Sequence, residues 1–205
     1  MDEGLSVAGR RDVLREAVLA AAEARVAAAG LAELGVREIA REAGCSSGMV
    51  YKLFASLDEL VLAVNARTLA ALGGAVAAGL GGMSDPGEAL CAMADAYLDY
   101  ATANTPRWDA LFAHRMASGV ALPDWYAGLR DRMFEDLAGM IGDVAPDAAA
   151  APGSFVRTLF SAVHGVVALG LQQKVAAVSP DELRAELRGL ITVVARGMAP
   201  VRCDR

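Results

Sequence analysis

The sequence predicts an all-α protein. Apolar residues make up 55% of the chain, and aromatic residues only 5%. This composition, rich in Ala and Leu, favours helices over strands. Most segments repeat apolar residues at helical spacing, and no segment shows the period-2 alternation of a strand. We therefore expect an N-terminal three-helix domain, residues 1–56, joined by a long helix to a C-terminal helical domain, residues 57–205.

The first helix is predicted over residues 12–29. Gly30 ends it, because glycine adopts the left-handed conformation that a helix end often needs. Residues 1–9 are expected to be disordered, with Arg10 and Arg11 just ahead of the helix. Its apolar stripe consists of Val13, Leu14, Ala17, Val18, Ala21 and Val26.

A helix-turn-helix is predicted from residue 37 onward. A short helix over 37–43 stops at Gly44, and either Ser46 or Ser47 can cap the next one, over 47–54. The second helix should bury Val50, Leu53 and Phe54, which leaves Gly48, Met49, Tyr51 and Lys52 on its other side. Ser56 caps a third helix with acidic residues in its first turn, where the helix dipole favours them.

The ends of the remaining helices are predicted from the positions of Pro, Gly and Ser residues. The connection at residues 145–153 should be flexible, and residues 79–82 form a glycine-rich break. Helices are predicted over residues 57–80, 85–104, 105–118, 123–141, 154–178 and 180–199.

Bulk properties exclude several classes of protein. No apolar run reaches the ~20 residues that span a bilayer, and no signal peptide is evident, so a cytoplasmic protein without membrane contact is expected. Three scattered cysteines and two histidines show no metal or catalytic spacing, so no metal, cofactor or enzymatic activity is expected. The net charge is −6, and residues 1–60 hold seven basic against ten acidic side chains. Any binding of DNA must therefore depend on the placement of charge.

The helix-turn-helix segment resembles the DNA-binding segment of the TetR family of transcriptional regulators. The shared features are Gly30, Leu31, Leu34, Val36, Arg37, Ile39, Ala40, Ala43, Gly44, Ser46, Tyr51, Phe54, Ser56, Glu59 and Leu60. Two positions depart from the family pattern. Gly35 replaces the usual Thr or Ser, and Leu57 replaces the usual Lys, and each change removes one phosphate contact.

The predicted DNA-binding residues lie on the second helix of this motif and around it. A helix of this kind enters the major groove, while arginines near helix ends bind phosphates or the minor groove. The set is Arg10, Arg11, Arg37, Ser46, Ser47, Gly48, Met49, Tyr51 and Lys52. An ordinary solvated helix face remains the alternative for Arg37 and Lys52.

A small-molecule site is predicted where aromatic residues gather outside the first domain. The resemblance implies an inducer site in this region, for a small apolar or aromatic ligand, whereas an ordinary core is the alternative for each residue. The candidates are Tyr97, Tyr100, Trp108, Phe112, Met116, Trp125, Phe134, Phe160 and His164. His164 is also compatible with a hydrogen-bonded core or interface position.

The last two predicted helices are apolar around much of their circumference. Such helices must be covered, and a second copy of the chain is the natural cover, as the resemblance also implies. We therefore expect a homodimer formed through the helices near 154–178 and 180–199. The combined hypothesis is a dimeric, ligand-responsive repressor that binds a palindromic operator. A helical small-molecule binder with a vestigial DNA-binding motif remains the alternative.

Overall fold

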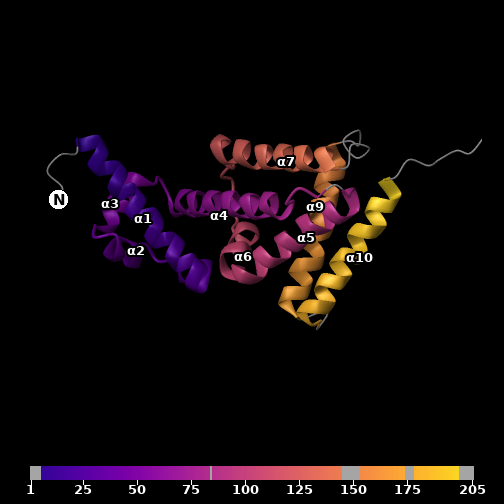
Figure 1. The fold of residues 1–205 in the computed structure, drawn as a ribbon. Coiled ribbons are helices and arrows are strands. Elements are labelled where there is room, and N and C mark those ends of the chain that lie inside the picture. Colours follow the sequence, from indigo (N-terminus) through magenta and orange to yellow (C-terminus); the bar gives the residue numbers. More distant parts are fainter. Residues whose placement is uncertain (1–5, 84, 145–152, 174–177, 199–205) are drawn as a thin grey trace, which may run out of the picture. The chain divides into compact units, whose positions relative to one another are not determined.

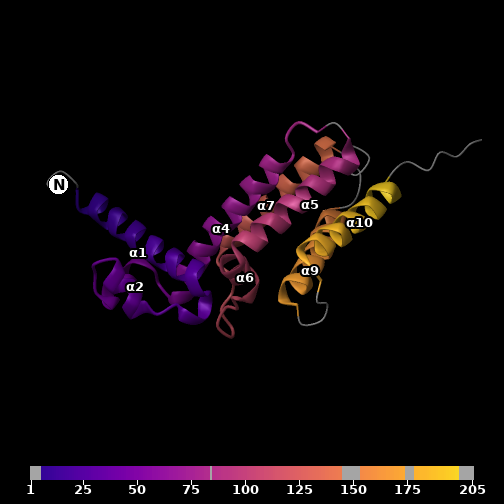
Figure 2. The same ribbon diagram turned by 60° about the horizontal axis from the view of Figure 1, so that its bottom comes forward.

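The computed structural model describes residues 6–83, 85–144, 153–173 and 178–198, and these form helices without any strand. This confirms the predicted all-α class. Figures 1 and 2 show the helices from two directions. They are α1 (Val7–Ala29), η1 (Leu31–Glu33), α2 (Val36–Glu42), α3 (Ser47–Leu53), α4 (Leu57–Gly79), α5 (Pro86–Ala103), α6 (Thr105–Ala113), α7 (Asp124–Val144), α9 (Gly153–Gln172) and α10 (Pro180–Met198).

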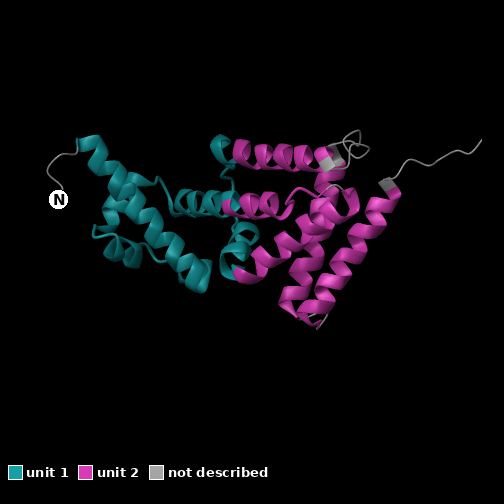
Figure 3. Cartoon of the chain, viewed as in Figure 1, with its two compact units in different colours: residues 1–70, 104–126 teal, residues 71–103, 127–205 magenta. Residues whose placement is uncertain are grey.

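The chain divides into two compact units, which Figure 3 distinguishes by colour. Unit 1 comprises residues 1–70 and 104–126, and unit 2 comprises residues 71–103 and 127–205. This division differs from the sequence-based boundary after residue 56, because the first part of α4 and the whole of α6 pack with the N-terminal helices. The functional boundary at residue 56 stays a prediction.

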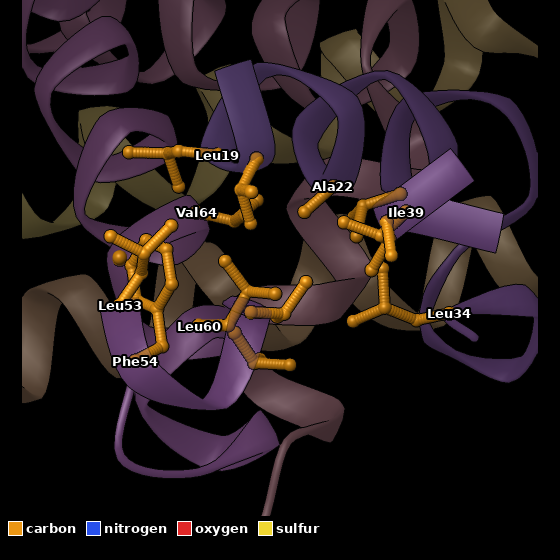
Figure 4. Packing of buried hydrophobic residues seen from close by; sticks show 14 of the residues in the cluster. Leu19, Ala22, Leu34, Ile39, Leu53, Phe54, Leu60 and Val64 are labelled. Carbon is orange, nitrogen blue, oxygen red and sulfur yellow. The ribbon is translucent and has the colours of Figure 1, made fainter. Parts of the chain in front are cut away.

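The core of unit 1 joins the helix-turn-helix to α4 and α6. Figure 4 shows Leu19 of α1 on the same side of the core as Leu53 and Phe54, Ala22 of α1 next to Ile39 of α2, and Leu60 of α4 in the middle of the cluster. The first three helices alone would bury little apolar surface, so α4 and α6 complete the core. The buried cluster is Val18, Leu19, Ala22, Val26, Leu34, Ile39, Ala40, Val50, Leu53, Phe54, Leu60, Val61, Ala63, Val64 and Ala110.

The start of α1 corrects a prediction. The helix begins at Val7 instead of residue 12, because the Ser6 hydroxyl accepts a hydrogen bond from the N–H of Gly9 at 3.1 Å and caps it. Arg10 and Arg11 therefore lie within the helix. Val13, placed in the apolar stripe by its spacing, is 57% exposed. The expected disorder of residues 1–5 lies outside the described residues.

Unit 2 is organised around the contact between α5 and α10, which share buried apolar residues and a row of ion pairs. Asp95 binds both Arg184 and Arg188 at 3.1 Å, and Arg188 also reaches Glu88 at 3.3 Å. α9 lies beside α10 in both ribbon views. A Cβ atom at Gly170 of α9 would collide with the side chain of Leu183 in α10, so glycine permits the close approach.

Two helices end earlier than predicted. α6 ends at Ala113, because His114 has extended backbone dihedrals, well before the glycine that suggested an end near residue 118. α9 ends at Gln172, because Gln173 adopts a left-handed φ of 51°. The predicted connection at 145–152 and the predicted helical residues 174–177 lie outside the described residues.

Two helices, Leu57–Gly79 and Phe155–Gln172, are long and apolar enough to cross a membrane by length and composition alone. Both are interrupted by polar residues, such as Arg67 in the first and His164 in the second, so neither is an unbroken apolar run of ~20 residues. Buried core helices pass the same test, and half of the apolar window in α4 is buried inside the molecule. Within α4, Arg67 forms ion pairs with α1, and Asn65 donates a hydrogen bond to α6. These partners explain the polar residues of α4 as part of the core of unit 1.

Candidate nucleic-acid interface

The turn between α2 and α3 has the geometry that its glycine predicts. Gly44 adopts a φ of 69°, a left-handed conformation in which a side chain would be strained. The N–H of Gly44 bonds to the carbonyl of Arg41 at 3.2 Å, and the N–H of Cys45 bonds to that of Ala40 at 2.8 Å. This pair of bonds satisfies the free carbonyls at the end of α2 and sets the direction in which α3 leaves.

Ser46 is the N-cap residue of α3. Its hydroxyl accepts a hydrogen bond from the N–H of Met49 at 3.2 Å, while its own backbone is extended, as a helix cap requires. The choice left open between Ser46 and Ser47 is thereby resolved. Ser46 is exposed and Ser47 is half-buried.

α3 presents a polar face away from the core. Val50 and Leu53 are buried, whereas Tyr51 is 53% exposed and Gly48 and Lys52 are exposed as well. Met49 departs from the predicted arrangement: it is half-buried and packs against the core of unit 1. The exposed set of α3 is thus a phenol, an ammonium group and bare backbone at Gly48, which suits contact with phosphates and base edges.

The first helix brings further cations to α3. The Arg11 guanidinium donates a hydrogen bond to the backbone carbonyl of Lys52 at 3.2 Å, and Arg10 is exposed one residue earlier. The guanidinium of Arg15 lies 4.5 Å above the ring of buried Phe54, which holds the end of α3 against α1. The Arg11 bond therefore places a guanidinium beside the end of α3 that carries Lys52.

The start of α2 carries mixed charge. Arg37 is exposed in its first turn, as predicted for a phosphate contact. Gly35 offers no side-chain cap, and a Cβ atom there would lie 2.1 Å from a carboxylate oxygen of Glu38. Glu38 thus reaches back over the beginning of α2, where the family's usual hydroxyl would stand. Its negative charge would repel an anion at the same helix end.

The start of α4 carries Leu57, the second position that departs from the family pattern. Leu57 is half-buried and packs against the core of unit 1. Ser56 accepts the N–H of Glu59 at 3.0 Å, and the Glu59 carboxylate accepts the N–H of Ala55 at 2.6 Å. This reciprocal capping confirms the predicted role of Ser56 and fixes the connection from α3 to α4.

The acidic surplus of the first sixty residues is partly neutralised by cations from later in the chain. Arg67 of α4 binds both Glu16 and Glu23, and Arg107 of α6 also binds Glu23. Within the segment, Arg25 pairs with Glu42 at 3.0 Å. Sequence counting over residues 1–60 missed Arg67 and Arg107, because their contact with α1 exists only in the folded chain. Among the described residues, the structure assigns no ion pair to Arg37 or Lys52.

The predicted ligand-binding residues are distributed over both units. Trp108, Phe112, Met116 and Trp125 belong to unit 1, whereas Tyr97, Tyr100, Phe134, Phe160 and His164 belong to unit 2. In unit 2 the hydroxyl of Tyr97 lies 2.9 Å from Nδ1 of His164, and the ring of Phe160 stacks on that imidazole at 6.0 Å. Phe160 also meets the rings of Tyr97 and Phe134 edge-on, at 5.9 and 5.5 Å. Tyr100 is half-buried.

Unit 1 also contains a buried polar residue, Asn65, that the sequence analysis missed. Trp108 is 2% exposed, and its ring meets that of exposed Phe112 at 5.3 Å. Trp125 packs edge-on against Tyr126 at 5.5 Å, and Met116 is half-buried. Asn65 is fully buried in α4 and donates to the carbonyl of Ala110 at 3.2 Å. A single Asn within an apolar stretch of α4 was the available sequence signal.

Tyr126 and His114 are two titratable side chains of unit 1. Burial raises the pKa of Tyr126, and a hydrogen bond from Asn65 acts in the opposite direction. Nε2 of His114 lies 3.5 Å from a carboxylate oxygen of Asp58 in the first turn of α4. Within the described ranges, no group of three or more His, Cys, Asp or Glu side chains could hold a metal ion.

α2 and α3 are joined by a tight turn at a glycine, and a serine caps the second helix, which exposes a tyrosine and a lysine. This arrangement defines a helix-turn-helix DNA-binding protein. Residues 18–64 match the bacterial regulatory proteins of the tetR family, and residues 90–194 match the domain described as tetracyclin repressor-like, C-terminal. The chain belongs to the TetR family of transcriptional regulators.

Solved structures share the fold. A protein of unknown function from Rhodococcus sp. RHA1 is 21% identical, with a TM-score of 0.71 over 98% of this chain and all of that one. A transcriptional regulator from the same source is 24% identical, with a TM-score of 0.67 over 89% and 96% of the two chains. A TetR family regulator from Marinobacter aquaeolei VT8 is 18% identical, with a TM-score of 0.60 over 92% and 96%. No curated protein matches the chain.

Proposed function

We propose that this protein is a ligand-responsive transcriptional repressor that binds a palindromic operator as a homodimer. The observation that carries the proposal is the surface of α3. Tyr51 and Lys52 are exposed on a helix whose other side is anchored in the core of unit 1. The Ser46 cap fixes its start and the Arg11 bond fixes its end. A rigid, locally positive helix of this length suits the major groove.

The dimer is proposed to form through α9 and α10. Val193 of α10 is 69% exposed, and Leu169 of α9 is exposed as well, in helices whose opposite sides are buried. Large apolar side chains at such positions favour coverage by a second copy. A two-fold dimer would then present two copies of α3 at roughly 34–36 Å, which corresponds to one turn of duplex.

Release is proposed to follow the binding of a small apolar or aromatic molecule among the aromatic residues of the helices between residues 86 and 172. Such a ligand would shift α4 and change the separation of the two α3 helices. It needs only to favour the non-binding state by a few kcal/mol, since population shift depends on differential affinity. Repression as the regulatory sign, and a cytoplasmic location, follow the family expectation.

The decisive experiment is selection from a randomised duplex library at low salt, followed by titration of the enriched sequence. An inverted repeat is expected, bound by the full-length protein with an affinity that falls as salt rises. Tyr51→Ala and Lys52→Ala should each weaken binding by roughly fivefold or more, as loss of one or two contacts predicts. Val13→Ala is the matched control, because Val13 is as exposed as Tyr51 but lies on α1.

Failure of the proposed DNA binding can be distinguished from failure of the proposed dimer. If no sequence is enriched and Tyr51→Ala binds duplex as the parent does, the helix-turn-helix is vestigial. The protein would then be a helical small-molecule binder. Enrichment of a sequence without two-fold symmetry would contradict only the palindromic dimer.

A further inference from the structure

We propose that Glu23 is a positioning residue that couples α6 to the DNA-reading helices. This inference depends on the proposed function, since it concerns how a change at the aromatic residues of α6 reaches α3. It assigns the coupling in unit 1 to one carboxylate on α1, which is held at the same time by α4 and by α6.

The geometry around Glu23 joins three helices at one side chain. Oε2 of Glu23 accepts a hydrogen bond from Nη1 of Arg67 in α4 at 3.0 Å. Oε1 accepts one from Nη2 of Arg107 in α6. The Glu23 and Arg107 side chains are mostly buried, so this pair is shielded from solvent more than an ordinary surface pair. Charge-assisted bonds of this kind hold their helices in a defined relation.

Arg107 stands next to the ring that a ligand on α6 would displace. Trp108 follows it directly in the nine-residue helix, and its ring is buried. Because a packed side chain of this size has no free space, movement of the ring must move the turn that carries Arg107. The movement would then stretch or break the bond to Glu23.

Glu23 in turn lies on the helix that supports α3. The side chains of Val18 and Leu19, one turn earlier in α1, share the core cluster with Val50 and Leu53 of α3. A shift of α1 at Glu23 therefore changes the support of the DNA-reading helix. This route does not require α4 to move first, and it uses a contact that the order of helices along the chain does not suggest.

Glu16 provides a matched comparison. It lies on the same helix and binds Arg67 through both carboxylate oxygens, at 2.6 and 2.5 Å, but the structure records no bond from it to α6. Glu16→Gln removes a link between α1 and α4 while it leaves the Glu23–Arg107 bond in place. Glu23→Gln weakens the link to α6, and Arg107→Gln weakens the same link from the other side.

The test uses reciprocity, so no inducer needs to be known. If α6 controls operator binding, operator binding must change α6 by the same coupling free energy. In a Trp125→Phe background, Trp108 is the only tryptophan, because the chain has two. Acrylamide quenching of its fluorescence is measured in the full-length protein, with and without the selected operator duplex at saturating concentration.

The duplex is expected to change the quenching constant in the Trp125→Phe parent. In Glu23→Gln and in Arg107→Gln the change should shrink by roughly half or more, because the contact that carries the coupling is weakened. The double variant should lose no more than either single one, because the two side chains act through one contact. Glu16→Gln should keep the full response.

Three results would overturn the proposal: no quenching change in the parent on binding duplex, an unaltered change in Glu23→Gln and Arg107→Gln, or an equal loss in Glu16→Gln. Circular dichroism melting shows whether each variant is folded, and the two variants of the pair guard against misfolding of one. If the parent binds no duplex at all, the proposed function fails first, and the coupling fails with it.

Discussion

Arg11 and Lys52 are joined by a hydrogen bond of 3.2 Å from the guanidinium to the backbone carbonyl, 41 residues apart in the chain. This bond ties the first turns of α1 to the end of α3. A side chain predicted from sequence as a DNA contact therefore also holds α3 in place.

Replacement of Arg11 by Ala is expected to weaken operator binding by about fivefold, because it removes a cation and the bond to α3 together. Arg11→Lys keeps the charge but not the planar donor group, so it should restore only part of the affinity. The measurement is fluorescence anisotropy titration of the selected duplex. Arg130→Ala, an exposed change on α7, is the control. Full affinity in Arg11→Lys would show that charge alone matters.

Glu38→Gln should raise operator affinity by about two- to fivefold, which corresponds to the effect of one charge at a helix end. The carboxylate reaches back over Gly35, where it would repel a phosphate bound at the start of α2. The same change should slightly reduce the unfolding free energy, because the acid also stabilises its helix. Titration and urea unfolding measure the two effects. Glu33→Gln removes an equal charge from the preceding turn, and an equal gain in that variant would point to net charge instead of position.

Val193→Glu is expected to convert a dimer to a monomer while the fold remains intact. Val193 is largely exposed in the single chain, so a carboxylate there costs little until a second copy covers it. Light scattering coupled to size-exclusion chromatography gives the mass, and circular dichroism gives the fold. Val13→Glu is the matched change at an exposed valine of unit 1. An unchanged dimer in Val193→Glu would place the interface elsewhere.

The contribution of Glu16 to stability should depend on pH. The hydrogen bond from Arg67 holds the pKa of Glu16 below its ordinary value of 4.5. A lowered pKa in the folded state means that the stabilisation is complete above pH 4.5 and is lost as the pH falls through the folded pKa. At neutral pH, Glu16→Gln should cost less than about 1 kcal/mol, because the pair is exposed. Urea unfolding at neutral and acidic pH measures this difference, and a difference that persists in acid would contradict the assignment.

Local signals made the helix-turn-helix predictable. Gly44, Ser46 and Ser56 act within four residues of themselves, through a left-handed turn and two caps, so the sequence alone was sufficient. The same kind of signal was missed at Ser6, because the acidic, glycine-containing segment around it was interpreted as disordered.

Contacts between distant residues were not predictable in this way. The bonds from Arg67 and Arg107 to Glu23 span 44 and 84 residues, and no spacing rule connects them. Met49 has the helical position of an exposed residue, yet it packs against the core, because its long flexible side chain reaches past the helix edge. The aromatic residues were recognised as one group by composition, whereas the fold divides them between the two units.

Because Leu60 and Val64 are buried among the side chains of the first three helices, the compact unit that contains the helix-turn-helix continues beyond residue 56. A chimera that exchanges the N-terminal domain between related regulators should therefore be joined after residue 56, near residue 70. A junction at residue 56 would pack the α4 of one protein against the first three helices of another. The mismatched core would destabilise the exchanged domain before its DNA specificity could be measured.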